Sequence, residues 1–466
     1  MGESCSESMT KSLRLPETED RKIGRFAANH PLECPIDPGK GKSTARCQNF
    51  LLRIAARNAL LTLECEMAKP PRRTDNSVAK GTMPLSFLDL EAHGRQRMFP
   101  DETALSNLKD TERVVLYPSY AYPAPDQSGW ILQVHGSVFE AVPENLPRKI
   151  MIRVLARLMG ATQEQLETSV FKQRILGFTV YQHGGKQIAV KIGDKTYQLR
   201  GKSKKNGQFR GTILIPNEDV DTIAMTVGAT RHVRYAIHSQ FDVATPLEGL
   251  VKLIDHHGVS IISDIDDTVK HTQVATRKDM LANTFLHEFA TVPGMVPLYQ
   301  KWQQQGAAFH YVTSSPWQLF EPLSDLFRDQ GLPDGSFHMK SVRFRDPTVL
   351  QLFIARRWGK RKAIKQLLRT FPDRKFVLVG DSGEKDPETY GVMARKFPDQ
   401  VVKIFIRDLG GKKSSDQRFA QAFKRVPQEK WQRFTCPSQL QEYDLPTSAQ
   451  FLPAEANGDG KSLPPP

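Results

Sequence analysis

The chain has 466 residues, too many for one ordinary hydrophobic core, so we expect two domains with tails. Its 39% of hydrophobic and 25% of charged residues are typical of a globular protein. The formal net charge of +14 favours acidic partners such as anionic lipid, nucleic acid or phosphorylated metabolites, without choosing among them. The five cysteines include no C-x-x-C pair, which argues against a disulfide framework and against a zinc site.

Residues 1–105 lack a sustained periodic pattern and contain several turn-rich pieces, so we expect this segment to be largely disordered. Its most apolar part, residues 50–63, is interrupted by Arg53 and Arg57, which excludes a membrane span. That part is expected to form a short helix that packs on the protein itself or, as an alternative, rests on a membrane surface. With no signal sequence or transmembrane segment found, we expect a cytoplasmic protein and leave peripheral membrane binding open.

Residues 106–245 are expected to form a β-rich accessory domain. Helices are predicted at 147–159 and 163–176, and the Asn206-Gly207 pair predicts a hairpin turn between strand-like runs at 197–200 and 209–215. No cluster of catalytic residue types occurs here, so we expect a structural or docking role. The other predicted strands are 114–117, 130–139, 187–192 and 232–237.

Residues 246–443 alternate between short apolar runs and helical patterns, which predicts a parallel sheet with crossover helices. The predicted fold class is therefore an α/β catalytic domain preceded by the β-rich accessory domain. Residues 444–466 end in three prolines and are expected to form a disordered tail. The predicted strands are 259–263, 308–312, 376–380 and 401–406, and the predicted helices are 296–305, 317–330, 360–371 and 388–397.

Carboxylates follow the strand at 259–263 without an intervening residue. Asp264 and Asp266 are two residues apart, so their side chains point the same way on an extended chain. Ligands of open α/β sheets bind at the carboxyl ends of the strands. Two close carboxylates resist joint ionisation unless a cation lies between them, and Mg²⁺ is the default hard divalent ion for such oxygen ligands. This strand end therefore predicts a magnesium site.

Two further strand ends carry polar side chains. Thr313 and Ser314 follow the strand at 308–312, and an acidic loop with Asp381 and Asp386 follows the strand at 376–380. Lys360 begins the helix between them. Each feature alone has an ordinary structural explanation as a helix cap, a solvated charge or a turn. Together and in this order they predict an active site.

The order D-x-D-x-T, strand-end Ser/Thr, Lys, then G-D-x-x-x-x-D resembles that of the haloacid dehalogenase (HAD) superfamily of aspartate-nucleophile phosphotransferases. More narrowly, residues 262–270, 311–319 and 376–388 resemble the catalytic domain of actin-patch-type phosphatidate phosphatases. The likeness spans roughly residues 246–443. It implies a HAD-like fold and the hydrolysis of phosphatidate to diacylglycerol and phosphate.

Carried onto this sequence, the resemblance implies that Asp264 attacks phosphorus and forms an aspartyl-phosphate. Asp266 first protonates the departing diacylglycerol oxygen and then deprotonates the hydrolytic water. Thr313 hydrogen-bonds a phosphoryl oxygen. Lys360 neutralises charge on the phosphoryl group and on Asp264.

The resemblance also implies that Mg²⁺ is held by the carboxylates of Asp264 and Asp381 and by the backbone carbonyl of Asp266. Asp386 helps directly or through water. Two assignments stay open, because a shift of one or two residues cannot be settled from the sequence. They are Ser314 in place of Thr313 and Lys362 in place of Lys360.

The substrate is inferred from the resemblance and from spacing. The intervals between Asp264, Thr313 and Lys360 leave no room for a large cap domain, which suits a bulky or membrane-embedded substrate such as phosphatidate. A phosphatase of another phosphomonoester is an alternative, a catalytically silent scaffold is a weaker one, and we find no nucleic-acid-binding motif. Basic residues near Lys360 either contact anionic headgroups or form a solvated face, and they are Lys340, Arg343, Arg345, Arg356, Arg357 and Arg361.

Overall fold

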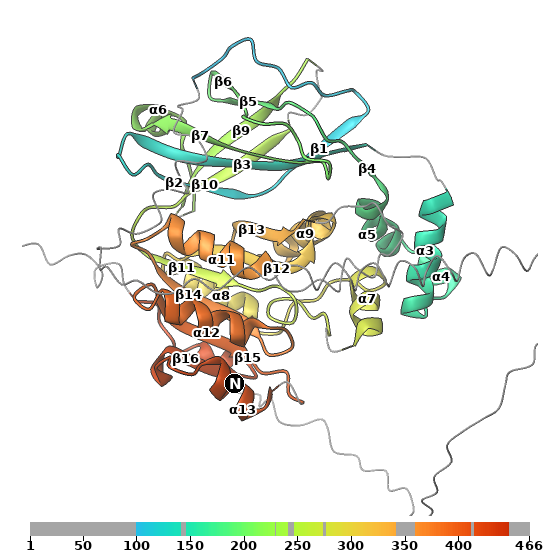
Figure 1. Ribbon diagram of the computed structural model, residues 1–466, viewed down its shortest axis with the longest axis vertical. Helices are drawn as coiled ribbons and strands as arrows, with labels where there is room; N and C mark the ends of the chain where they lie inside the picture. Colours follow the sequence, from blue (N-terminus) through green and yellow to red (C-terminus); the bar gives the residue numbers. More distant parts are fainter. Residues whose placement is uncertain are drawn as a thin grey trace, which may run out of the picture. The chain divides into compact units, whose positions relative to one another are not determined.

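The computed structural model describes residues 99–140, 146–228, 230–240, 247–273, 276–341, 359–411 and 414–446. The expectations for residues 1–98, including the helix at 50–63, and for the tail from residue 447 lie outside the described residues. All described residues fall within one compact unit of the chain, Pro84–Pro466, and their strands form two sheets (Figure 1). No helix of this described part is both long and apolar enough to cross a membrane.

The first sheet is mainly antiparallel and is organised around β3, which pairs with β1, β2, β4 and β7. Alternate residues of β3, including Leu132, Val134 and Val138, are buried in the core of this sheet, because successive side chains of a strand point to opposite faces. A short helix, α6 (Asn217–Ile223), follows β7. The strands are β1 (Glu112–Leu116), β2 (Ser119–Pro123), β3 (Gly129–Glu140), β4 (Tyr181–Gln182), β5 (Ala189–Ile192), β6 (Lys195–Gln198), β7 (Gln208–Pro216), β8 (Met225–Val227), β9 (Thr230–His238) and β10 (Glu248–Leu253).

The hairpin predicted at Asn206-Gly207 is wrong. The strand β6 pairs with β5, whereas β7 pairs along its whole length with β3. Gly207 does adopt a left-handed backbone with φ of 73°, and its N–H donates to Lys204 O, so the dipeptide forms a local turn. A turn signal determines the local backbone but not the strand that pairs next.

The first sheet also includes β10, so it extends past residue 245, where the catalytic domain was expected to begin.

The second sheet has the order β13-β12-β11-β14-β15-β16, and each neighbouring pair of its strands is parallel. The predicted α/β fold class is therefore confirmed, and β13 and β16 are short edge strands that the sequence patterns did not reveal. Its strands are β11 (Val259–Ser263), β12 (Ala308–Pro316), β13 (Gly335–Lys340), β14 (Lys375–Asp381), β15 (Val401–Arg407) and β16 (Trp431–Phe434). Its helices are α7 (Arg277–Phe285), α8 (Met295–Gln304), η1 (Trp317–Leu319), α9 (Phe320–Gln330), α11 (Gly359–Thr370), α12 (Asp386–Lys396), α13 (Asp416–Ala422), η3 (Gln428–Lys430) and η4 (Pro437–Leu440).

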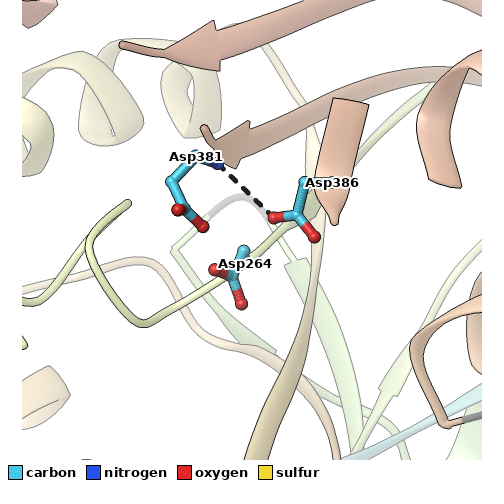
Figure 2. A group of neighbouring side chains, drawn as sticks. All are labelled: Asp264, Asp381 and Asp386. Carbon is cyan, nitrogen blue, oxygen red and sulfur yellow. Dashed lines mark hydrogen bonds between the residues drawn. The ribbon is translucent and has the colours of Figure 1, made fainter. Parts of the chain in front are cut away.

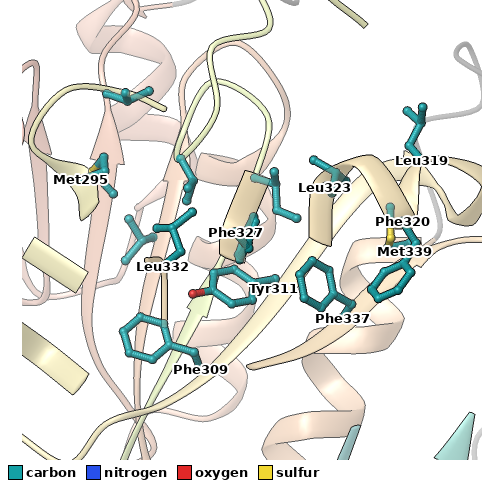
Figure 3. Packing of buried hydrophobic residues seen from close by; sticks show 14 of the residues in the cluster. Met295, Phe309, Tyr311, Leu319, Phe320, Leu323, Phe327, Leu332, Phe337 and Met339 are labelled. Atoms are coloured by element: carbon teal, nitrogen blue, oxygen red, sulfur yellow. The ribbon is translucent and has the colours of Figure 1, made fainter. Parts of the chain in front are cut away.

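Both faces of this sheet are buried, because successive strand residues join different cores. In β11, Ile261 packs in the cluster that includes α8 and α9, whereas Ile262 packs in the cluster that includes α11, α12 and α13. Figure 3 shows the first of these cores, where the rings of Tyr311 and Phe327 lie 4.6 Å apart. Continuous apolar runs in the strands are what a sheet covered on both faces requires.

Three helices inserted between β3 and β4 pack on the catalytic domain rather than on their own sheet. They are α3 (Leu146–Met159), α4 (Gln163–Glu167) and α5 (Ser169–Thr179). The single helix predicted at 163–176 is divided, because the Thr168 side chain caps α5 by accepting from Phe171 N. The ring of Phe178 in α5 lies 5.3 Å from that of Phe285 in α7. Figure 1 shows α3, α4, α5 and α7 grouped together.

Candidate active site

The strand order brings together the three strand ends identified in the sequence. The central strand β11 lies between β12 and β14, and it runs parallel to both. Asp264 follows β11 directly and its N–H donates to Val379 O at 2.9 Å, which fixes it beside the end of β14. Thr313 lies near the end of β12, and Asp381 is the last residue of β14.

Three buried carboxylates face one another at this edge of the sheet. Figure 2 shows the side chains of Asp264, Asp381 and Asp386 beside one another, and each offers an oxygen within 4.8 Å of those of the other two. The Asp381 N–H donates to Asp386 Oδ2 at 3.4 Å. Gly380 permits this approach, because a Cβ atom at that position would lie 2.5 Å from Asp386 Oδ2.

The ammonium group of Lys360 lies against this cluster. Lys360 Nζ is 2.9 Å from an oxygen of each of Asp264, Asp386 and Glu384, and it directs its hydrogen bonds to the latter two. Lys362, the alternative left open by the sequence, is exposed two residues further along α11. Within the described residues, Lys360 is thus the lysine that the fold brings to Asp264.

Burial and crowding favour protonation of these carboxyl groups in the absence of a cation. Burial, with the neighbouring carboxylates, raises the pKa of Asp264 well above its usual range despite Lys360, and burial with Asp386 raises the pKa of Asp381 to about 8. The pKa of Asp386 is raised by burial and by Glu384. For Lys360, burial alone would lower the pKa, but the carboxylates outweigh it and raise the pKa.

A hard divalent cation fits this set of donors. Both carboxylate oxygens of Asp264 and Oδ2 of Asp381 are buried and accept no hydrogen bond from the described residues, and Asp264 Oδ1 has only the ion pair with Lys360. Three carboxylates, those of Asp264, Glu384 and Asp386, thus share the ammonium group of Lys360, and Asp381 lies beside two of them. Unpaired buried anions are costly, and oxygen ligands of this kind are those that Mg²⁺ binds.

Asp266 has a different environment from Asp264. Its Oδ2 accepts hydrogen bonds from Thr313 Oγ1 at 2.9 Å and from Ser315 Oγ at 2.7 Å. Its Oδ1 accepts from Thr272 Oγ1 at 2.8 Å and lies 3.0 Å from Lys270 Nζ. Burial alone would raise the pKa of Asp266, but Lys270 and the hydroxyl groups outweigh it and lower the pKa. The two aspartates of D-x-D therefore have opposite preferences for protonation.

Of the two candidate hydroxyl groups, Thr313 contacts Asp266, whereas Ser314 Oγ donates to Glu384 Oε2 at 3.1 Å. Sequence reasoning missed Ser315 and Thr272 as partners of Asp266. Ser315 lies near the end of β12 and Thr272 lies in the loop after β11, and only the fold shows that they converge on one carboxylate.

Sequence reasoning also missed the roles of Lys270 and Glu384. Lys270 is held in place by the backbone of the same loop, where Asp267 has a left-handed φ of 57° and its N–H donates to Lys270 O. Glu384 lies in the acidic loop after β14 and reaches Lys360. The sequence signal for Glu384 is its place in the G-D-x-x-x-x-D segment.

The basic residues proposed for headgroup contact are only partly described. Arg361 is exposed at the start of α11 and Lys340 is half-buried at the end of β13. Arg343, Arg345, Arg356 and Arg357 lie outside the described residues.

The residues of this site lie in a segment of the chain that matches a known protein family. Residues 259–408 match the family model described as phosphatidate phosphatase APP1, catalytic domain. Phosphatidate phosphatase APP1 of Saccharomyces cerevisiae is 32% identical over 259 residues, which are 52% of this chain and 41% of that protein. An uncharacterized protein of Schizosaccharomyces pombe is 36% identical over 163 residues, 34% of this chain and 26% of that one. The chain thus spans less than half the length of either relative.

A solved structure is also similar to part of the chain. The crystal structure of a candidate HAD-like phosphatase from Mesorhizobium loti has 15% sequence identity and a TM-score of 0.23, with 36% of this chain and 87% of that one covered. A similarity of this size does not assign a fold or a function. The resemblance predicted from the three strand ends is confirmed by the family model, which matches residues 259–408.

Proposed function

We propose that the chain is a Mg²⁺-dependent phosphatidate phosphatase that works through an aspartyl-phosphate. One observation carries the proposal: Asp264 is buried at the end of β11 beside Lys360, Asp381 and Asp386, within the segment that matches the catalytic-domain family. Because the chain spans less than half of either curated relative, the activity and the substrate of the yeast phosphatase are transferred to this chain as a proposal.

The metal would be held by the carboxylates of Asp264 and Asp381 and by the backbone carbonyl of Asp266. Asp386 would be a further ligand, either directly or through water. When bound, Mg²⁺ supplies positive charge that permits these carboxylates to ionise together and that offsets charge on the phosphoryl oxygens. The raised pKa values of Asp264, Asp381 and Asp386 support this assignment, since groups that resist ionisation without a cation gain most from one.

In the first half-reaction, an Asp264 carboxylate oxygen attacks phosphorus and the bond between phosphorus and the glycerol oxygen breaks. Asp266 gives its proton to that oxygen, so diacylglycerol leaves as an alcohol. Lys360 offsets the charge of the phosphoryl group, and Thr313 or Ser314 hydrogen-bonds one of its oxygens. In the second half-reaction, Asp266 accepts a proton from water as the water oxygen attacks phosphorus, which releases phosphate and restores Asp264.

In the free protein, the contacts of Asp266 favour its role as the proton acceptor of the second half-reaction. Lys270, Thr272 and Ser315 favour the ionised carboxylate, which is the form that accepts a proton. The negative charge of an arriving phosphoryl group raises the pKa of Asp266, since like charges disfavour ionisation. Substrate binding thus promotes the protonated form that the first half-reaction needs.

The partner of this reaction is an anionic phospholipid at a membrane surface. We propose peripheral binding to the cytoplasmic side of a membrane, because phosphatidate is a membrane lipid and no membrane-spanning helix is found in the described residues. The net charge of +14 favours association with such a surface.

The test is phosphate release from phosphatidate in mixed micelles and from a panel of soluble phosphomonoesters, with and without Mg²⁺. Asp264→Asn keeps the shape of the nucleophile and removes its charge, and Asp373→Asn, at an exposed site, is the matched control. We expect Mg²⁺-dependent release from phosphatidate by the wild type and by the control, and none by Asp264→Asn. Phosphate release from soluble esters alone would support the mechanism and would show that the substrate is another phosphomonoester rather than phosphatidate. No release from any substrate would reject the enzyme.

A further inference from the structure

One face of α3 presents cations and aliphatic side chains to solvent in two parallel rows. Arg153 and Arg157 are exposed one helical turn apart, and Lys149 lies one turn before them. In the next row, Ile150, Val154 and Leu158 are 41%, 39% and 36% exposed. We call these six residues the basic-apolar face of α3.

The opposite side of the helix is fully occupied. Met151, Leu155 and Met159 are buried in the same core as Leu281 and Phe285 of α7. The exposed aliphatic row is therefore not a core row left uncovered by poor packing, since the helix already has a complete buried row. Three large aliphatic side chains in a row on a surface mark an interaction site more often than three scattered ones.

The charge of this face selects one class of partner. The helix α3 contains no acidic residue, and within the described residues neither Arg153 nor Arg157 takes part in an ion pair. The side chain of Lys278 in α7 also approaches Gly160, directly after α3. Cations beside an aliphatic row are complementary to an anionic lipid surface, where the cations meet headgroups and the aliphatic side chains enter the acyl boundary.

The helix α5, which packs in the same core as α3, is joined to the catalytic loop. Arg174 of α5 donates to Thr284 O at 3.2 Å, and its guanidinium lies 3.3 Å from the centroid of the Phe289 ring. Lys270 Nζ lies 4.5 Å from the same centroid and 3.0 Å from Asp266 Oδ1. A surface bound by α3 would therefore be held close to the loop that carries Asp266.

We propose that the basic-apolar face of α3 binds an anionic membrane surface and holds the active site at the lipid. The inference rests on the proposed function, since it names the surface by which the enzyme reaches a membrane substrate. It differs from that function in its residues, because none of the six is placed in the catalytic machinery.

The binding test uses the full chain with Asp264→Asn, so that no turnover alters the lipid, and vesicles of phosphatidylcholine with or without phosphatidylglycerol. The apolar variant replaces Ile150, Val154 and Leu158 by Gln, which keeps good helix formers in α3. The charge variant is Arg153→Gln with Arg157→Gln. The matched control replaces three aliphatic residues of similar exposure outside α3 by Gln, and they are Leu105, Val227 and Leu250.

We expect the parent protein and the control to sediment with phosphatidylglycerol vesicles, less so at high salt. The charge variant should lose affinity on the order of tenfold or more, since each cation near an anionic surface contributes about fivefold. The apolar variant should lose at least about tenfold. Vesicle binding that is absent, or equal in all variants, overturns the proposal. Circular dichroism and thermal unfolding check that each variant is folded.

The same variants in the active chain separate this inference from the proposed function. We expect them to raise the apparent KM for phosphatidate in vesicles and to leave hydrolysis of monomeric short-chain phosphatidate unchanged. If monomeric substrate is hydrolysed but vesicle binding does not depend on α3, the membrane-binding face is rejected and the proposed function stands. If vesicle binding depends on α3 but no substrate is hydrolysed, the proposed function is rejected and the membrane-binding face stands. A dimer in light scattering that the apolar variant converts to monomer would show that a second copy covers this face, and it would overturn the lipid assignment.

Discussion

Lys360 Nζ lies 2.9 Å from Oδ1 of Asp264, and the Asp264 side chain is withdrawn from solvent. Removing the ammonium group would leave Asp264 among carboxylates without a neighbouring cation from the described chain. In the proposed mechanism, the Asp264 carboxylate would then be more easily protonated, and the phosphoryl group would lose the charge of Lys360. This pair is therefore where a single substitution has the clearest effect on turnover.

We expect Lys360→Met to lower kcat/KM for Mg²⁺-dependent phosphate release on the order of 10²–10³-fold. The matched control is Lys362→Met, which removes an exposed charge from the same helix and should retain activity within about twofold. Equal losses in the two variants, or a larger loss in Lys362→Met, would contradict the assignment of Lys360.

Removal of Asp381 should change the response of the protein to metal. Without metal, Asp381→Asn relieves repulsion among buried carboxylates, so the free energy of unfolding in EDTA should rise by roughly 1–2 kcal/mol. Mg²⁺ at about 100 times its Kd should stabilise the wild type by about 2.7 kcal/mol, and it should stabilise the variant by much less. Urea unfolding with EDTA and with Mg²⁺ measures both changes, with Asp373→Asn as the control. If Mg²⁺ stabilises Asp381→Asn as much as it stabilises the wild type, Asp381 is not a metal ligand.

Lys270 is expected to act as a positioning residue for Asp266. Lys270→Met removes the cation 3.0 Å from Asp266 Oδ1, so the pKa of Asp266 should rise. We expect kcat, which includes the second half-reaction in which Asp266 is the proposed base, to fall about 10–100-fold, and the acidic limb of the kcat–pH profile to move to higher pH. Lys191→Met, on an exposed position of β5, serves as the control. A lower rate with an unmoved profile would indicate damage to the loop rather than an effect on Asp266.

The sequence predicted the catalytic strand ends well because their signal is local. Each strand is a short apolar run, and Asp264, Thr313 and Asp381 lie at or directly beyond such runs, where a parallel sheet places its ligands. Lys360 was identified by its order in the chain, but the choice between Lys360 and Lys362 needed the direction in which the first turn of α11 faces.

What the sequence could not show is which distant segments meet. The spacing of Met151, Leu155 and Met159 predicts a helix with a buried side, but not that this side packs on α7 of the catalytic domain. The partners of Asp266 come from the loop after β11 and from the last residues of β12, and no period in the sequence links Thr272 to Ser315. The Asn206-Gly207 turn failed as a hairpin signal for the same reason, since pairing depends on the whole sheet.

His310 joins the two sheets in a way that predicts acid sensitivity. It is fully buried on β12, where its ring lies 5.5 Å from that of Tyr120 in the first sheet and its Nδ1 is 2.7 Å from Ser336 Oγ. Its Nε2 has no hydrogen-bond partner among the described residues. Burial, with nearby positive groups, lowers the pKa of His310 well below its usual value, so the folded protein keeps this ring neutral.

Below about pH 6.5 the unfolded chain therefore binds a proton at His310 that the folded protein does not, and stability falls as the pH falls by up to about 1.4 kcal/mol per pH unit for this residue. Above that pH the contribution is fully present. His310→Gln should reduce the slope of unfolding free energy against pH by about that amount between roughly pH 6.5 and pH 4.5, whereas His287→Gln, at an exposed site, should leave it unchanged. Urea unfolding across this window measures the slope. Parallel curves for the wild type and His310→Gln would show that this ring is protonated in the folded protein or that the contact with Tyr120 opens before unfolding.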